Sequence, residues 1–260
     1  MVHAVPDILA RIVERKRTEL AELAPYRREL ERRAEHRPEP RDFQAHLTAN
    51  PPAIIAEIKQ ASPSRGTLGA DFDPRRIART YYEGGAAALS VLTDHDFFQG
   101  SLTDLELARH EVPLPVLRKD FTINELHVIE AAAHGADAIL LIAALLDVAE
   151  MQRFRELAES HGMAALVEVH DERELDAALS SGAKIIGVNN RNLHTFEVTF
   201  ETSIRLAAKM PGGIVKVAES GIKSKADVDL LRAAGFHAFL VGEHLMKSVD
   251  PTQALRELRS

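Results

Sequence analysis

The chain of 260 residues contains no cysteine, which excludes disulfides, thiolate metal sites and cysteine nucleophiles together. It also lacks any apolar run near the ~18 residues that a membrane-spanning helix needs, so we expect no membrane partner. Its first residues do not show the basic-then-apolar order of a secretory signal peptide. Together with the missing disulfides, which fit a reducing compartment, this predicts a soluble cytoplasmic protein.

Charge of neither sign dominates. The 32 Lys and Arg against 39 Asp and Glu give a formal charge of −7. This modest acidity argues against a dedicated nucleic-acid binder, although a local basic pocket could still hold an anion. The 45% hydrophobic and 27% charged residues exclude collagen-like, low-complexity and wholly disordered chains.

Residues 1–48 are polar with helical periodicity, and the pattern breaks at Pro38 and Pro40. We expect a helical extension that packs on the domain formed by residues 49–260. A charged, solvated helix pair is one interpretation of the extension and a lid over a site is the other. Position in the sequence does not separate them. We expect the extension to contribute to the wall of a substrate pocket.

From Pro51 onward, short apolar runs alternate with amphipathic segments such as 147–161 and 225–234. Nearly continuous hydrophobic runs are typical of parallel strands that are covered by helices on one face and by a core on the other. The expected strands are Ile54–Lys59, Ala88–Leu92, Pro115–Lys119, Ala138–Ile142, Ala165–Val169, Ile185–Val188, Val215–Glu219 and Ala238–Val241. Eight such units predict an α/β fold, a (β/α)8 TIM barrel with an N-terminal helical extension. A doubly wound open sheet is the alternative, but no G-x-G-x-x-G turn follows the first strand.

Polar residues close most of these strands. Alternation along the first strand places Glu57 and Lys59 on the same face. In a barrel, ionisable groups at the carboxyl ends of strands point into the catalytic mouth. A buried ion-pair network that merely fills the barrel explains any one of these charges but not the whole set. The candidate catalytic residues among these charges are Glu57, Lys59, Lys119, Glu168 and Glu219. Asn189 and Arg191 close the sixth strand, and Ser220 follows Glu219 at the end of the seventh.

Glycine follows the seventh and eighth strands, at Gly221 and Gly242. Backbone N–H groups at such turns can bind a phosphate, and Ser62 after the first strand could add a hydroxyl. A phosphorylated small molecule is therefore the favoured ligand class.

Other classes of site find little support. The twelve histidines form no H-E-x-x-H pattern, so no metal is expected, and no cofactor motif such as a Walker loop is present. His95 and His170 follow strand ends, and we interpret both as solvated loop residues. Ser220 lacks the G-x-S-x-G nucleophile elbow.

Seven strand-end segments occur in an order that resembles the indole-3-glycerol-phosphate synthase family. They are IAEIKQASPSRG, LSVLTDHDFFQGS, PVLRKDF, ALVEVHD, IIGVNNRNL, VAESGI and FLVGEHLM. The N-terminal segments ILARIVERKRTEL and RDFQAHL are similar to the helices that precede the barrel in that family. The resemblance implies ring closure of 1-(2-carboxyphenylamino)-1-deoxyribulose 5-phosphate, with loss of CO₂ and water.

The resemblance also implies roles. Lys119 would protonate the developing alkoxide, and Glu168 would be the base in the dehydration, with Lys59 or Lys119 as the acid. Glu57 and Glu168 would stabilise the cationic intermediate. Asn189, Glu219 and Ser220 would contact the hydroxyls and the carboxylate of the substrate. Ser62, Gly221 and Gly242 would hold its phosphate. Phe98 and Leu193 would pack on its aromatic ring.

Two rivals stay open on the sequence. A phosphoribosyl-anthranilate isomerase, or another sugar-phosphate barrel enzyme, is disfavoured by the Glu57/Lys59 pair and by the missing cysteine. A non-catalytic phosphate-ligand binder would be expected to have lost its charged strand ends. Where some family members carry serine after the glycine of the eighth strand, this chain has Glu243, whose carboxylate must point away from a phosphate. We expect a monomer.

Overall fold

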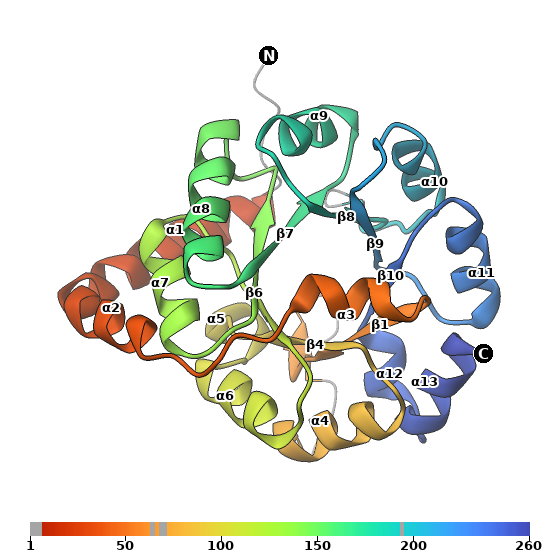
Figure 1. The fold of residues 1–260 in the computed structure, drawn as a ribbon, viewed down its shortest axis with the longest axis horizontal. Coiled ribbons are helices and arrows are strands. Elements are labelled where there is room, and N and C mark those ends of the chain that lie inside the picture. The colour runs from red at the N-terminus through yellow and green to blue at the C-terminus, as the bar shows by residue number, and fades with distance from the viewer. Residues whose placement is uncertain (1–6, 63–65, 68–71, 193–194) are drawn as a thin grey trace.

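The computed structural model describes residues 7–62, 66–67, 72–192 and 195–260. Eight parallel strands close into a barrel in which every strand neighbours the next one along the chain (Figure 1). The strands are β1 (Ala53–Ile58), β4 (Ala88–Leu92), β5 (Val116–Lys119), β6 (Ala138–Ile142), β7 (Ala164–Val169), β8 (Ile185–Asn189), β9 (Val215–Glu219) and β10 (Ala238–Val241). The predicted barrel and all eight predicted strands are confirmed, with ends that agree to within one residue.

Helices surround the barrel and bury the outward face of each strand. They are α4 (Pro74–Glu83), α6 (Leu102–Glu111), α7 (Glu125–Ala133), α8 (Val148–Ser160), α9 (Glu172–Ser180), α10 (Glu201–Ala207), α11 (Lys225–Ala233) and α13 (Pro251–Arg259), with the short α5 (His95–Phe98) and α12 (Glu243–Lys247). A side chain accepts a hydrogen bond from the first turn of most of these helices, as Asp147 does for α8 and Ser224 for α11. After β1, β2 (Ala61–Ser62) and β3 (Gly66–Thr67) form a small antiparallel pair.

The barrel interior is filled by inward-facing apolar residues from all eight strands. Ile55, Leu117, Leu166, Val217 and Leu240 belong to this inner cluster, whereas neighbours of opposite orientation pack against the helices. Because side chains alternate along a strand, the residue two positions later points inward as well. Those positions carry glutamate, lysine or glycine, so the apolar floor ends at a ring of functional groups.

The N-terminal segment forms α1 (Asp7–Leu23), the 3-10 turn η1 (Ala24–Tyr26), α2 (Arg27–Glu35) and α3 (Phe43–Ala49). Helix α3 lies across the centre of the barrel in Figure 1, and it contributes Phe43 and Leu47 to the inner cluster. It therefore closes the end of the barrel from which the strands begin. Helix α2 packs on α7 through the buried Leu30 and Ala34.

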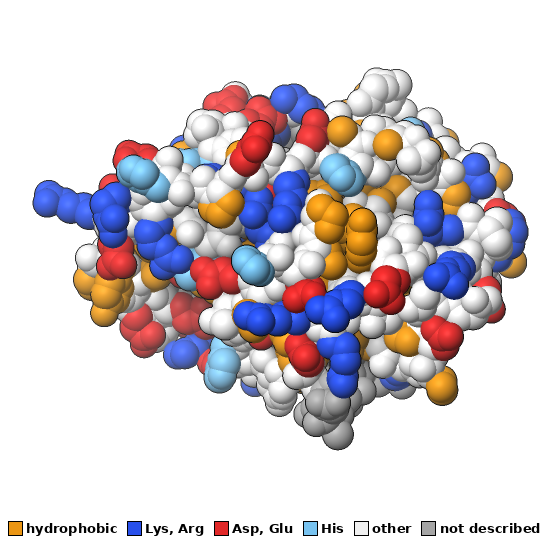
Figure 2. Space-filling model, turned by 60° about the horizontal axis from the view of Figure 1, so that its bottom comes forward, with side chains coloured by type: hydrophobic (Ala, Val, Ile, Leu, Met, Phe, Trp, Pro, Cys, Tyr) orange, Lys and Arg blue, Asp and Glu red, His pale blue; other side chains and the backbone are white. Residues whose placement is uncertain are grey.

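The surface carries charges of both signs. On the face drawn in Figure 2, lysine and arginine side chains are interspersed with aspartate and glutamate rather than gathered into one basic field. Within the described part of the chain, no helix is both long enough and apolar enough to cross a membrane.

Candidate active site

A cavity of about 980 Å³ lies where the strands end. Eleven of the residues predicted for the site line it: Glu57, Lys59, Phe98, Lys119, Glu168, Asn189, Arg191, Glu219, Ser220, Gly221 and Gly242. Leu193 lies outside the described residues, and of Ser62 only the backbone is described, in β2. The structure thus gathers residues that are up to 185 positions apart (57 to 242) around one space.

Lys119 is the centre of the charged group. Its Nζ lies 2.9 Å from Oε2 of Glu168 and 3.2 Å from Oε2 of Glu219. Burial disfavours the ammonium ion, but the carboxylates of Glu168, Glu219 and Glu57 outweigh burial and raise the pKa of Lys119 above its ordinary value. Lys119 therefore enters a reaction at neutral pH as a positively charged acid.

The two carboxylates beside Lys119 differ in their environment. Burial, opposed by Lys119 and reinforced by Glu168, raises the pKa of Glu219 to about 7. Burial acts in the same direction on Glu168, but Lys119 and His170 overcome it and hold the pKa of Glu168 well below its usual range. Glu168 is thus a carboxylate at neutral pH, whereas Glu219 exchanges its proton near neutrality.

A second lysine–glutamate pair lies at the end of β1. Lys59 Nζ is 2.7 Å from Oε1 of Glu57, and the Lys59 side chain is only 16% exposed. Gly242, at the end of β10, makes room for this pair, because a methyl group at that position would overlap with the Glu57 carboxylate. The predicted shared face of Glu57 and Lys59 is confirmed by the contact.

Two asparagines and one serine complete the polar wall at the ends of β8 and β9. Asn189 Nδ2 donates to Oε1 of Glu168 at 3.1 Å. Asn190 donates instead to the backbone oxygen of Glu219 at 2.9 Å, which fixes the loop behind the site. Ser220 has a φ of 68°, a left-handed conformation that is uncommon outside glycine and is a feature of functional turns.

The interpretation of His170 as a solvated loop residue is wrong. Its side chain is 13% exposed, with Nε2 3.3 Å from Oε1 of Glu168 and Nδ1 3.0 Å from Oε2 of Glu174. Glu174 lies on α9, so the imidazole is buried by a helix that follows it in the chain. His95 is solvated as predicted, with 84% of its side chain exposed.

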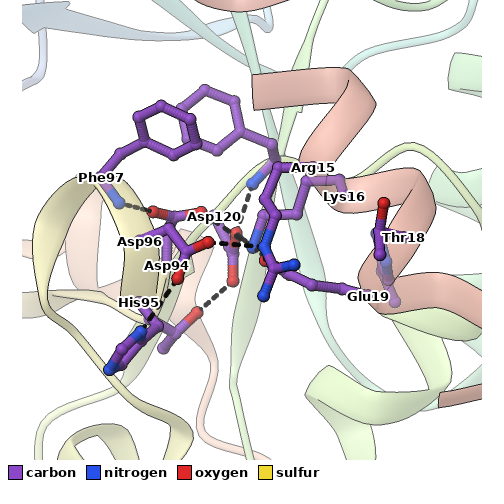
Figure 3. Close-up of polar contacts among 12 residues, drawn as sticks. Arg15, Lys16, Thr18, Glu19, Asp94, His95, Asp96, Phe97 and Asp120 are labelled. Carbon is purple, nitrogen blue, oxygen red and sulfur yellow. Dashed lines mark hydrogen bonds and ion pairs between the residues drawn. The ribbon is translucent and has the colours of Figure 1, made fainter. Parts of the chain in front are cut away.

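Helix α1 forms part of the cavity wall through Ile8, Leu9 and Ile12. One turn further on, Lys16 turns away from solvent toward the ends of β4 and β5 (Figure 3). Its Nζ lies 3.0 Å from Asp94 and 2.8 Å from Asp120, and its side chain is 5% exposed. This buried charge cluster fastens the apolar wall directly beside Lys119.

Apolar and cationic groups that sequence reasoning missed also line the cavity. Phe121 lies against Phe98, with ring centroids 6.1 Å apart. Phe196, Val198 and Phe200 approach from the segment after β8, and Lys223 and Lys247 add positive charge. Only the position of Lys223, just after the Ser-Gly turn of β9, offered a signal in the sequence.

The side chains of Arg191 and Glu243 lie at the rim. Arg191 Nη1 donates to the backbone oxygen of Phe196 at 3.3 Å, and Nη2 lies 3.9 Å from Glu243. Glu243 also pairs with Lys247 at 2.6 Å. Among the described residues, no group of three or more His, Asp or Glu is arranged to hold a metal ion.

Comparison with known proteins places this geometry in a family. A family model described as indole-3-glycerol phosphate synthase matches residues 9–258. The indole-3-glycerol phosphate synthase of Polaromonas naphthalenivorans is 51% identical over 259 residues, which cover 97% of this chain and 98% of that protein. The protein of the same name from Chloroherpeton thalassium is 50% identical over 246 residues, covering 92% of this chain and 95% of that protein.

Among solved structures, the N-acetylmannosamine-6-phosphate 2-epimerase of Clostridium perfringens superimposes with a TM-score of 0.60. The match covers 80% of this chain and 90% of that chain at 18% sequence identity. At that identity the likeness concerns the barrel fold alone.

Proposed function

The chain belongs to the indole-3-glycerol phosphate synthase family, and from this premise we propose how its residues carry out the reaction. The enzyme is a decarboxylating lyase of tryptophan biosynthesis. It closes the ring of 1-(2-carboxyphenylamino)-1-deoxyribulose 5-phosphate and releases CO₂ and water to give indole-3-glycerol phosphate. The observation that carries the proposed roles is Lys119, held between Glu168 and Glu219 at the floor of the strand-end cavity.

The first step forms the carbon–carbon bond. The ring carbon that bears the carboxylate attacks the C2 carbonyl of the sugar, and the carbonyl oxygen becomes an alkoxide. Lys119 donates its proton to this oxygen, as a charged lysine at neutral pH can do. The ring system is then cationic, and the neighbouring carboxylates of Glu57 and Glu168 stabilise it.

Decarboxylation and dehydration follow. The C–CO₂ bond breaks, and its electron pair restores the aromatic ring. Glu168 then removes a proton from C1 of the sugar while the C2 hydroxyl leaves as water, protonated by Lys59. Glu168 suits the role of base because it is ionised at neutral pH and Asn189 fixes its Oε1 by a hydrogen bond of 3.1 Å.

The contact between Lys119 and Glu168 closes the proton cycle. After turnover Glu168 holds the C1 proton and Lys119 lacks one, and the 2.9 Å contact between them allows a direct return. Lys59 regains its proton from water, since the reaction consumes one proton when the substrate enters as a carboxylate. Proton transfer along this one hydrogen bond therefore restores the starting protonation states of both Glu168 and Lys119.

We assign substrate binding to residues at the periphery of the same cavity. Gly221 and Gly242 follow β9 and β10, and their backbone N–H groups are proposed to hold the phosphate with Ser62. Phe98 and the α1 residues Ile8 and Ile12 provide apolar surface for the anthranilate ring. Asn189, Glu219 and Ser220 are assigned to the sugar hydroxyls and the substrate carboxylate.

Lys119→Ala tests the assignment of the acid. We expect kcat to fall by ~10²-fold or more, the lower end of a general-acid contribution, while the variant still binds the substrate. Substrate affinity by calorimetry and turnover by product fluorescence separate the two effects. A near-normal kcat would remove Lys119 from the mechanism.

We also propose that the enzyme acts as a cytoplasmic monomer without nucleic-acid or membrane partners. All groups in the proposed mechanism come from one chain, and the face in Figure 2 has no basic field. Light scattering coupled to gel filtration checks the first point, with an expected mass near 28.7 kDa.

A further inference from the structure

The imidazole of His170 lies between two carboxylates that belong to different elements. Nε2 is 3.3 Å from Oε1 of Glu168, which closes the inward face of β7. Nδ1 is 3.0 Å from Oε2 of Glu174 on α9, and the same oxygen accepts the backbone N–H of His170 at 2.7 Å. Glu174 thus fixes both the ring and the turn that carries it.

The charges around this group explain its protonation state. Burial disfavours an imidazolium ion, but the contacts with Glu168 and Glu174 outweigh burial and raise the pKa of His170 to about 10. His170 is therefore a cation over the neutral range. On the opposite side, Glu168 faces Lys119 from β5, with Glu219 from β9 close by. Glu57 from β1 acts on Lys119 and Glu219.

Glu168 consequently has two cationic neighbours, and only one of them takes part in the proposed chemistry. Lys119 gives its proton away in the first step and is neutral until Glu168 returns one. During that interval Glu168 lies in a buried site with Glu219 close by, where a lone carboxylate is unfavourable. His170 does not touch the Lys119 side of the carboxylate and keeps its charge throughout.

We propose that His170 is a positioning residue: anchored on Glu174, it holds a positive charge beside Oε1 of Glu168 and remains the positive neighbour of this carboxylate while Lys119 is deprotonated. The inference rests on the proposed roles of Glu168 and Lys119. It assigns no contact between His170 and the substrate. Glu174 acts one step further out, as the anchor of the imidazole.

The test is the pH dependence of kcat in His170→Gln, which keeps a hydrogen-bond donor but cannot carry charge. We expect the acidic limb of the profile to move up by about one unit or more, because an opposite charge within a few ångströms lowers a carboxyl pKa by ~1–3 units. At neutral pH we expect kcat to fall by ~10-fold or more, with KM changed much less. Glu174→Gln should shift the pH profile of kcat in the same direction by a smaller amount. This variant provides the test if His170→Gln does not fold.

His95→Gln is the matched control, since His95 also follows a strand end but is exposed; its profile should equal that of the parent enzyme. Glu168→Gln separates the inference from the proposed function. If Glu168→Gln is inactive and both His170→Gln and Glu174→Gln keep the parent profile, the role of His170 is overturned and the mechanism stands. If Glu168→Gln turns over normally, the proposed role of Glu168 fails, and the positioning role falls with it.

Discussion

Replacing Lys16 by methionine should weaken the attachment of helix α1, a wall of the substrate cavity, to the barrel. The methionine side chain fills similar space but leaves Asp94, which is fully buried, and Asp120 without their shared cation. Asp120 keeps its contacts with Arg118 and Thr93, whereas Oδ2 of Asp94 has no other partner among the contacts of the described residues. The uncompensated charge of Asp94 is thus the main cost.

The expected magnitude follows from this burial. Removing one partner of a buried ion pair costs ~3–5 kcal/mol, because the remaining charge is left desolvated and unpaired. For a chain of this size each kcal/mol lowers the melting temperature by ~2–4 °C, so we expect a decrease of roughly 6–20 °C. Ile8, Leu9 and Ile12 lie on the same helix as Lys16 and line the substrate cavity, so the KM for the substrate should rise as well.

The contribution of this charge cluster to stability should depend on pH in a defined direction. The neighbouring aspartates, acting against burial, raise the pKa of Lys16, so its contribution is complete below the unfolded value of ~10.4 and is lost as the pH rises through the folded value. Despite burial, Arg118 and Lys16 lower the pKa of Asp120, so its contribution is complete above ~3.9 and is lost as the pH falls. Parent and variant should therefore differ by a constant amount between pH ~6.5 and ~10.4, and the difference should change at lower pH, because Lys16 also lowers the pKa of His127.

The assay compares thermal unfolding by circular dichroism with steady-state KM for Lys16→Met, Lys16→Met/Asp94→Asn and Arg17→Met. Arg17 is the matched control, since it neighbours Lys16 on α1 but its side chain is 68% exposed. The double variant should recover part of the stability, because asparagine carries no charge. If Lys16→Met matches Arg17→Met in both melting temperature and KM, the reasoning about the cluster is refuted.

Two further predictions concern a buried histidine on α7 and a glycine on β8. Burial and the nearby Arg118 lower the pKa of His127 to about 4, against ~6.5 when unfolded, so stability should fall by ~3 kcal/mol as the pH drops from about 7 to 4. His127→Gln should flatten that slope in urea titrations, and parallel curves for variant and parent would contradict the assignment. Gly187→Ala would place a methyl group onto the buried Glu219 carboxylate, so kcat should fall at least ~10-fold, and the overpacking should also lower stability by ~1–3 kcal/mol. Unchanged turnover would show that Glu219 can move without consequence.

The strand-end residues could be predicted because the barrel imposes a simple rule. Each strand alternates between inward and outward side chains, so Leu166 in the core fixes Glu168 at the mouth, and Val217 fixes Glu219 in the same way. Composition and periodicity therefore sufficed to predict the fold and the charged residues at the strand ends, but not the apolar lining of the cavity. The resemblance in seven segments led to the family, which the comparisons confirm.

The buried partners of the site could not be predicted so readily. Lys16 has its counter-ions on β-strand ends that are about 80 to 100 residues away, and only its position on the apolar stripe of Leu9 and Ile12 offered a signal. His170 and Glu174 are four residues apart, but the pair spans a turn and a helix start, where spacing alone does not imply contact. The wrong interpretation of His170 and the omission of Lys16 have one cause: a charged residue is expected to be solvated until its tertiary partner is known.

The most direct test of the account is turnover of 1-(2-carboxyphenylamino)-1-deoxyribulose 5-phosphate by the purified chain. Indole absorbance or fluorescence reports the product, and the protein contains no tryptophan to obscure it. The account predicts saturable formation of indole-3-glycerol phosphate with one CO₂ released per indole. Measurable binding of the substrate without product would contradict it.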